Sequence, residues 1–337
     1  MKLTEQVIAG RSWLCFHGND YHRLARHPKV LETATVCLAQ EGLSVSASRR
    51  TTGNHPLYGE LEESLAEFLG LEAAILIPSG YLANQAAMSA VQGTLYLPSR
   101  HHPSLHDAAR GRAAVIVEPS SLPAEPDSWF AFDPIEANTG RHDPSLAGAA
   151  AQIPNLVIDD CHGIGVVGDG RGFRKFLTPA PSQLLLTGTL SKAFGCFGGF
   201  IGSTKESVAE IRRQAGAYVG STPFPLPIAA GALAAISVLR AEPERYEIIA
   251  RHRTRVAQGV AMIQDADWML PSLGAIVSCP VSSRFSQPEL SARLEHAGIF
   301  PPFVQYPGAP AGGHFRFTVS SAHTDEEVDR LLEALSL

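Results

Sequence analysis

The sequence contains few cysteines, and no two of them have the spacing of a metal site. The number of cysteines is odd, at five, and no two form a CxxC motif. They are Cys15, Cys37, Cys161, Cys196 and Cys279. Disulfide frameworks and structural zinc sites both need cysteines that pair at regular spacings. We therefore expect neither a disulfide framework nor a metal site.

Long apolar runs and a large excess of one charge are also missing. The longest apolar run, 226–239, has 14 residues, whereas a membrane span needs about 20. A net charge of −6 gives no general attraction to nucleic acid or to an anionic membrane. The first twenty residues lack the apolar core and small-residue cleavage site of a secretion signal. We expect a cytoplasmic protein that binds neither nucleic acid nor membrane.

The sequence does contain a series of short, unbroken apolar runs between segments with helical periodicity. The β-type runs are 73–77, 113–117, 129–132, 155–159, 184–187 and 198–202. Strands without polar alternation are typical of a parallel sheet that helices cover on both faces. We predict an α/β protein with a mostly parallel central sheet.

Periodicity and capping signals predict several helices. A leucine stripe indicates a helix over 57–69, and residues 79–91 read as a turn that leads into a second helix. Thr324 and Glu327 have the spacing of a capping box that opens a C-terminal helix. We divide the chain into a large α/β domain and a smaller α+β domain from both termini, at 45–230 and at 1–44 with 231–337.

A lysine beside a glycine-rich segment is the first candidate for chemistry. Lys192 follows the run 184–187 and precedes the glycines of FGCFGG. Partial desolvation there favours the neutral amine, which can attack an aldehyde. Thr189 and Ser191 carry hydroxyl groups suited to a phosphate. Taken alone, the segment fits a surface lysine in a flexible loop better.

Two aspartates and a histidine follow the run 155–159. Asp159 ends this run, and Asp160 and His162 come directly after it. A carboxylate at the C-terminal end of such a strand points into the crevice where α/β sheets bind ligands. Opposite a pyridine nitrogen, it would keep that nitrogen protonated. An aspartate that bonds its own turn is the common alternative.

The next residues match a dinucleotide-binding pattern that we reject. Gly163, Gly165 and Gly168 fit GxGxxG, but that motif requires the first glycine directly after a strand and a helix at the last. Here DDCH intervenes and DGRG follows, so no helix is expected to start there.

A possible phosphate site follows the run 73–77. Ser79, Gly80 and Tyr81 open a predicted helix, and the free N–H groups of a helix N-terminus bind anions. An ordinary strand-to-helix turn is equally compatible with this pattern.

A histidine cluster comes further along the chain. His102 could stack on an aromatic cofactor, and with His101 and His106 it could also bind a metal ion. Zinc needs further ligands at defined spacing, and Asp107 is the only carboxylate nearby. We therefore consider the metal site the weaker reading.

Together and in this order, these motifs resemble the α-oxoamine synthases, a family of fold-type I pyridoxal-phosphate enzymes. The resemblance rests on TGNHPLYGELEESLAEFLG, SGYLAN, the His-x-Ser at His102, DDCHGIGVVGDGRG and GTLSKAFGCFGG. It extends from Asn19-Asp20-Tyr21 to the C-terminal SSAHTDEEVDRLLEAL, over nearly the whole chain.

The resemblance implies a set of cofactor contacts. Lys192 forms the Schiff base with pyridoxal phosphate and later acts as general base. Asp159 pairs with the pyridinium nitrogen, His162 bonds the phenolic oxygen, and His102 stacks on the ring. The implied phosphate-binding residues are Ser79, Gly80, Tyr81, Thr189, Ser191 and, from the neighbouring subunit, Thr222.

The resemblance also implies substrates and a partner. Asn19 and Arg316 hold the carboxylate of an amino acid, which suits the forked guanidinium of arginine. The second substrate is an acyl thioester of coenzyme A or of a carrier protein. Decarboxylation then gives an α-amino ketone. A homodimer with shared active sites is implied by Thr222.

Several positions differ from the family pattern. Ala137 replaces a serine, Asp133 replaces a glutamate, and His314 replaces an arginine. Arg50 stands where some members have a small or polar residue that contacts the acyl group. The segment before Asn19 is short.

These differences concern substrate contacts and leave the cofactor set intact. An aminotransferase, or another pyridoxal-phosphate reaction on the same scaffold, is therefore the alternative to acyl transfer. A non-catalytic relative is a third hypothesis. The presence of Lys192, Asp159, His162 and His102 argues against it, because a binding module needs no such set.

Overall fold

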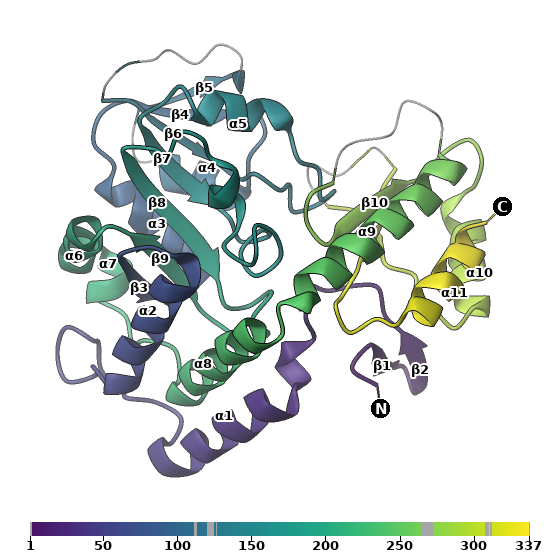
Figure 1. Ribbon diagram of the computed structural model, residues 1–337, viewed down its shortest axis with the longest axis horizontal. Coiled ribbons are helices and arrows are strands. Elements are labelled where there is room, and N and C mark those ends of the chain that lie inside the picture. The colour runs from purple at the N-terminus through teal and green to yellow at the C-terminus, as the bar shows by residue number, and fades with distance from the viewer. Residues whose placement is uncertain are drawn as a thin grey trace.

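The computed structural model describes residues 2–110, 113–119, 125, 127–264, 272–306, 310 and 312–336, and they form two lobes (Figure 1). The larger lobe contains a seven-stranded sheet and the smaller lobe a three-stranded sheet. A hairpin of β1 (Glu5–Ile8) and β2 (Arg11–Leu14) lies beside the smaller lobe. The 3₁₀ turn η1 (Leu24–Arg26) follows it.

The large sheet has the strand order β3-β9-β8-β7-β6-β4-β5. The pairs from β8 to β5 are parallel, and β9 is antiparallel to both neighbours, so the predicted mostly parallel sheet is confirmed. The bounds are β3 (Ala73–Ile77), β4 (Leu95–Pro98), β5 (Ala114–Val117), β6 (Trp129–Phe132), β7 (Asn155–Asp159), β8 (Gln183–Thr189) and β9 (Gly199–Ser203). The apolar runs predicted all of these except β4.

Helices cover both faces of this sheet, as the unbroken apolar strands predicted. Along β7, Leu156 and Ile158 join one hydrophobic core while Val157 joins the other, because successive side chains point to opposite faces. The helices of the first face are α2 (Pro56–Leu69), α5 (Pro144–Ala150) and α8 (Leu226–Ala241). Those of the second are α3 (Gly80–Ala90), α4 (Pro103–Ala109), α6 (Lys205–Gln214) and α7 (Gly216–Val219).

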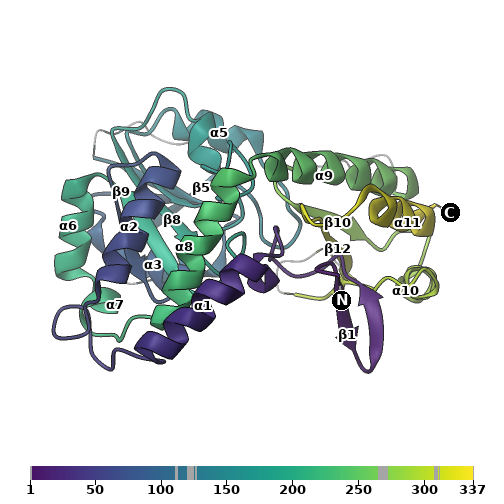
Figure 2. The ribbon, with the colours of Figure 1, turned by 60° about the horizontal axis from the view of Figure 1, so that its bottom comes forward.

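Helix α1 (Pro28–Glu41) packs along α8, and Figure 2 shows the two side by side. Its Val30 and Cys37 belong to the same core as the buried residues of α8. The division at 45 and 230 stays a prediction, and this packing favours larger-lobe boundaries that include both helices. No single helix in the described part of the chain has the length and apolarity for a membrane span. Helices α8 and α9 (Glu244–Ile263) meet that test only as a pair bent by 80°.

The smaller lobe forms a separate hydrophobic core. Its sheet has the order β10-β12-β11 with antiparallel pairs. The elements are α9 (Glu244–Ile263), β10 (Ile276–Pro280), α10 (Gln287–His296), β11 (Phe303–Val304), β12 (His314–Thr318) and α11 (Asp325–Leu335). The capping box at Thr324 is confirmed, because its side chain accepts from Glu327 N and the Glu327 side chain accepts from Thr324 N.

The C-terminal ends of the parallel strands bring the candidate residues to one edge of the large sheet. The N-terminus of α3 follows β3, His102 follows β4, and Asp133 follows β6. Asp159 ends β7, and Lys192 comes three residues after the end of β8. Residues from five segments therefore meet where an α/β sheet binds its ligand.

Candidate active site

A cavity of about 200 Å³ lies at this edge of the sheet. Its walls are Gly80, Tyr81, His102, Ser104, Asp133, Asp159, Cys161, His162, Thr189 and Lys192. A second cavity of about 860 Å³ shares His102, Asp133, His162 and Lys192 with it. Lys192 and His162 therefore stand at the junction between an inner cavity and a larger outer one.

The amine of Lys192 faces a buried histidine. Its Nζ lies 2.7 Å from His162 Nε2, and His162 Nδ1 lies 2.6 Å from the hydroxyl of Tyr21. Burial, followed by the positive charges of Lys192 and Arg316, holds the pKa of His162 well below its usual range. The imidazole is therefore neutral, with one nitrogen that donates and one that accepts.

Asp159 is buried and oriented through both of its oxygens. Its Oδ2 accepts from Asn84 Nδ2 at 2.6 Å, and its Oδ1 accepts from the Cys161 backbone N–H at 3.3 Å. Asn84 Nδ2 also donates to Ser104 Oγ at 2.7 Å, and Asn84 Oδ1 accepts from Thr187 Oγ1 at 2.5 Å. Asn84, itself held by Ser104 and Thr187, therefore fixes the orientation of the Asp159 carboxyl group. Asn84 is part of the motif SGYLAN, but the sequence alone did not predict a role for it.

A second carboxyl group lines the same cavity. Asp133 Oδ1 accepts from the His102 backbone N–H at 3.3 Å. Burial, and then the nearby Asp159, raise the pKa of Asp133 well above its usual range. This shift favours the protonated form of Asp133, which can donate a hydrogen bond, unlike an ionised carboxylate.

The opposite end of the inner cavity is formed by the N-terminus of α3. A Cβ on Gly80 would lie 3.0 Å from Thr189 Cβ and 3.2 Å from Cys161 Sγ, so a side chain there would narrow the cavity. The predicted Ser79 is the N-cap and accepts from Leu82 N at 3.2 Å. The first residues of α3, Gly80 and Tyr81, line the cavity, and the free N–H groups of a helix N-terminus suit an anion.

The other predicted phosphate contacts differ in position. Thr189 lines the inner cavity, and its Oγ1 donates to Gly198 O at 3.0 Å. Ser191 is exposed, and its backbone N–H donates to Thr189 Oγ1 at 3.1 Å. Thr222 is exposed and borders neither cavity. Tyr81 lies at the rim, with its hydroxyl bonded to Asp107.

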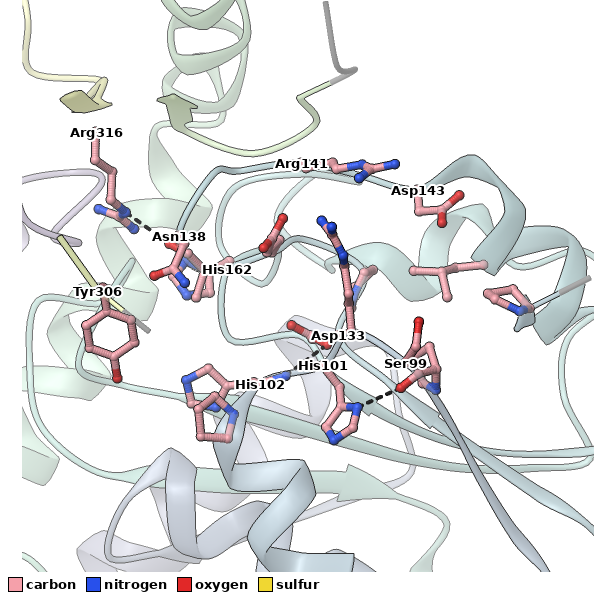
Figure 3. Close-up of a pocket in the computed structure, with 18 of the residues that line it drawn as sticks. Ser99, His101, His102, Asp133, Asn138, Arg141, Asp143, His162, Tyr306 and Arg316 are labelled. Atoms are coloured by element: carbon pink, nitrogen blue, oxygen red, sulfur yellow. Dashed lines mark hydrogen bonds between the residues drawn. The ribbon is translucent and has the colours of Figure 1, made fainter. Parts of the chain in front are cut away.

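His102 lines both cavities and is the N-cap of α4. Its Nδ1 lies 2.6 Å from Ser104 Oγ and 4.0 Å from Asp159 Oδ2. Figure 3 shows it beside His162 and Asp133. The rings of His101 and His106 stack with centroids 6.0 Å apart. In the described part of the chain, no three His, Cys, Asp or Glu side chains gather in a set that could hold a metal.

The two predicted substrate residues meet in the outer cavity. Arg316 Nη2 donates to Asn19 Oδ1 at 2.9 Å, and Arg316 Nε donates to Ala137 O at 2.9 Å. His314 Nε2 lies 3.0 Å from Asn138 O. In Figure 3, Arg316 and Asn138 lie on one side of His162. Residues from the N-terminal segment and the smaller lobe thus reach the mouth of the inner cavity.

The rejected glycine motif forms a loop without a helix at its start. Residues 160–172 contain turns and one isolated bridge, between Ile164 and Arg171, and the next helical residues are those of the 3₁₀ turn η3 (Phe173–Phe176). Asp160 Oδ2 accepts from Phe173 N at 2.6 Å. Gly163 and Gly172 are needed because a Cβ at either would fall on the Asp160 carboxyl group. These glycines therefore pack around Asp160.

Comparison with known proteins identifies the family. The model of the family described as aminotransferase class I and II matches residues 152–335. The 8-amino-7-oxononanoate synthase of Methylococcus capsulatus is 32% identical over 355 aligned residues, with 99% of this chain and 91% of the relative covered. That of Halorhodospira halophila is 34% identical, with 97% and 86% covered.

Solved structures agree on the fold. A serine palmitoyltransferase from S. paucimobilis with a bound PLP-myriocin aldimine has a TM-score of 0.88 at 22% identity, with 99% of this chain and 89% of that chain covered. An 8-amino-7-oxononanoate synthase from Francisella tularensis has a TM-score of 0.78 at 19% identity, with 96% of each chain covered. The predicted fold-type I architecture is confirmed. The chain belongs to the aminotransferase class I and II family and, within it, to the α-oxoamine synthases.

Proposed function

We propose that this chain is a pyridoxal-phosphate-dependent acyltransferase that condenses an amino acid with an acyl thioester. The products are an α-amino ketone, carbon dioxide and the free thiol. The observation that carries the proposal is the Lys192 amine, 2.7 Å from His162 Nε2 at the junction of two cavities. The relatives named 8-amino-7-oxononanoate synthase support acyl transfer over transamination.

The inner cavity fits pyridoxal phosphate. The carboxyl group of Asp159 suits the pyridine nitrogen, and the N-terminus of α3 at Gly80, with Thr189, suits the phosphate. The amine of Lys192 lies in the same cavity. When bound, the cofactor withdraws electrons from the amino-acid Cα and makes its proton removable. His102, which faces both cavities, is suited to pack on the ring.

The residues around the cofactor have separate tasks. Asp159, held by Asn84, keeps a proton on the pyridine nitrogen. Lys192 Nζ accepts and returns the proton at Cα, and His162 Nε2 is within hydrogen-bonding distance of that amine. Asp133 offers a neutral O–H group at the border of the two cavities. Proton transfer needs these groups within hydrogen-bond reach of one another.

Arg316 and Asn19 are suited to the carboxylate of the amino acid. Arginine binds carboxylates through two parallel N–H donors, and the pairing of Arg316 with Asn19 and Ala137 O fixes the plane of its guanidinium. The outer cavity beyond them has room for the acyl thioester. The acyl group comes from a thioester of coenzyme A or of a carrier protein.

We also propose a homodimer whose partner contributes to each active site. Thr222 borders neither cavity of its own chain and is exposed. Two apolar side chains are exposed as well: Tyr81, which lines the inner cavity, by 40%, and Phe197, in the glycine-rich segment after Lys192, by 52%. A second subunit against this surface would cover them and bring its Thr222 to the phosphate. The cytoplasmic location stays a prediction.

The first test is a visible absorption spectrum of the purified protein during titration with amino acids. A cofactor band that an amino acid perturbs, with thiol released only when acyl-coenzyme A is added, is the expected result. Lys192→Ala should lose both turnover and the wild-type band, whereas Lys205→Ala on exposed α6 should keep both. Conversion of the cofactor to its pyridoxamine form without thiol release would instead indicate transamination.

A further inference from the structure

Tyr21 is buried against the residues around Lys192 but has no part in the proposed function so far. Its side chain is fully buried, and its hydroxyl lies 2.6 Å from His162 Nδ1. The other ring nitrogen of His162 lies 2.7 Å from Lys192 Nζ. The imidazole is therefore held at both nitrogens, by a phenol on one side and an amine on the other.

The surroundings of Tyr21 decide the direction of its hydrogen bond. A phenol has one proton, and two acceptors are within reach, His162 Nδ1 at 2.6 Å and Asn19 Oδ1 at 3.4 Å. Asn19 Oδ1 already accepts from Arg316 Nη2 at 2.9 Å. The phenol proton therefore points to the closer acceptor, His162 Nδ1.

The neutral state of both rings follows from their burial. Burial raises the pKa of Tyr21 and keeps the phenol protonated. The groups that act on His162 are Tyr21 from the N-terminal segment, Lys192 after β8, Arg316 on β12 and His102 before α4. Three of them are cationic or can become so, and none of them is an acid that would stabilise an imidazolium. A neutral ring that accepts at Nδ1 must carry its proton on Nε2.

We propose that Tyr21 is a positioning residue, whose hydroxyl donates to His162 Nδ1 and so fixes the ring proton on Nε2, facing Lys192. The Nε2–H group then points to the Lys192 amine, whose Nζ lies 2.7 Å away, and donates to its lone pair whenever that amine is in its neutral form. A neutral amine is the form that attacks an aldehyde. The inference thus rests on the proposed function for its purpose, although the proton position itself does not.

The same tyrosine joins the Lys192 amine to the predicted carboxylate site. Asn19 Oδ1 accepts from Arg316 Nη2 at 2.9 Å and lies 3.4 Å from the Tyr21 hydroxyl. A substrate carboxylate that draws Arg316 toward itself would therefore free an acceptor near the phenol. Through Tyr21 and His162, occupancy of the carboxylate site can change the environment of the amine.

The proton position can be measured by ¹⁵N NMR of the full-length chain with labelled histidine. We expect His162 to give one protonated nitrogen, Nε2, and one unprotonated nitrogen, Nδ1, with the assignment made from His162→Gln. In Tyr21→Phe the difference between the ¹⁵N signals of the two His162 ring nitrogens should disappear or reverse. Tyr58→Phe is the matched control, because Tyr58 is equally buried and its hydroxyl donates to Phe224 O at 2.7 Å. That variant should keep the wild-type pattern.

The functional arm measures how fast the cofactor-free protein captures pyridoxal phosphate, followed by the visible band. Tyr21→Phe should capture it about tenfold more slowly, the factor that corresponds to the loss of one hydrogen bond to a buried group. A protonated Nδ1 in the wild type, or an unchanged ring pattern in Tyr21→Phe, would overturn the inference. An unchanged capture rate in that variant would also overturn it.

The two arms separate this inference from the proposed function. If the wild-type protein captured no pyridoxal phosphate, the proposed function would fail, and the NMR arm would still decide the position of the His162 proton. If the wild type captured the cofactor but the two ring patterns were the same, only the role of Tyr21 would be lost.

Discussion

At the scale of single residues, the inner cavity holds two aspartates that differ in their donors. Asp159 receives donors on both oxygens from Asn84 and the Cys161 N–H group. Asp133 receives one weak donor, from His102 N at 3.3 Å. Burial and the nearby Asp159 raise the pKa of Asp133, which favours its protonated form. Carboxyl groups in different surroundings can thus take different roles in one site.

This contrast predicts opposite responses to the same substitution. Asp133→Asn replaces one neutral group by another and should keep kcat/KM within a few-fold of the wild type. Asp159→Asn removes the charge that holds the pyridinium proton, and kcat/KM should fall by about 10²–10³-fold, as for the loss of a preorganised electrostatic group. Because the pKa of Asp133 is raised, its carboxyl group should ionise only at high pH and then lose its O–H donor. The amide in Asp133→Asn keeps its N–H donors at every pH tested. Steady-state kinetics from pH 6 to 9 test both variants, and equal losses would contradict the assignment.

Arg316 offers a second prediction at this scale. Arg316→Ala leaves the substrate carboxylate without its two N–H donors, so KM for the amino acid should rise by about 30-fold or more, which corresponds to at least ~2 kcal/mol for a paired charge. Arg240→Ala is the control, because Arg240 lies on the surface of α8 and bonds Ser64 O. Initial rates over a range of amino-acid concentrations measure the effect. An unchanged KM in Arg316→Ala would remove it from the carboxylate site.

At the scale of elements, the loop 160–172 is built around a buried carboxyl group. Asp160 is fully buried, accepts from Phe173 N, and has its Oδ1 without a hydrogen-bond partner among the described residues. Burial raises the pKa of Asp160 well above its usual range. The folded protein therefore keeps this proton at pH values where the unfolded chain has lost it.

The stability of the protein should consequently depend on pH through Asp160. A raised folded pKa contributes stability that is complete below the unfolded pKa and is lost as pH rises toward the folded pKa. Between these limits the free energy of unfolding should fall by up to about 1.4 kcal/mol per pH unit from this group. Asp160→Asn should flatten the slope. Urea unfolding without cofactor from pH 4.5 to 8 measures it, and parallel slopes in wild type and variant would contradict a protonated Asp160.

Elements were predictable from sequence where their signals are local. The strands β3, β6 and β7 carry unbroken apolar runs, and Thr324 carries its capping box within four residues. Strand β4 was not predicted, because its four residues end in a proline and no sequence signal marks where the strand begins or ends. The contacts of Asn84 with Asp159 and of Tyr21 with His162 join residues 75 and 141 positions apart. No local pattern encodes such pairs, so the positioning residues of the site became visible only in the fold.

At the scale of the whole molecule, the N-terminal segment joins the two lobes at the site. Thr318 N donates to Phe16 O at 2.8 Å, which attaches this segment to β12. His22 Nε2 lies 2.5 Å from Gly165 O, which attaches it to the loop after β7. Asn19 and Tyr21 lie between these two anchors. The position of both residues relative to Lys192 therefore depends on the way in which the lobes are held together.

The proposed homodimer gives the last prediction. Helix α1 buries Val30 and Cys37 in the core it shares with α8, yet Leu31 is 49% and Leu38 is 42% exposed, and Leu43 just beyond is 72% exposed. Apolar side chains that gather on one surface are typical of a protein interface. We expect the double variant Leu31→Glu and Leu38→Glu to shift the protein from dimer to monomer, because a charged side chain is costly to bury without a partner.

Light scattering after size-exclusion chromatography measures the mass of each species, and the same fractions are assayed for acyl transfer. The control is Met262→Glu, since Met262 is 78% exposed on α9 in the smaller lobe and should leave mass and activity unchanged. If Thr222 of one subunit completes the site of the other, the monomeric variant should also bind pyridoxal phosphate more weakly. A monomeric wild type with full activity would contradict the dimer. A monomeric variant with unchanged cofactor affinity would show that each subunit binds its cofactor alone, since the lost interface would then carry no contact to the phosphate.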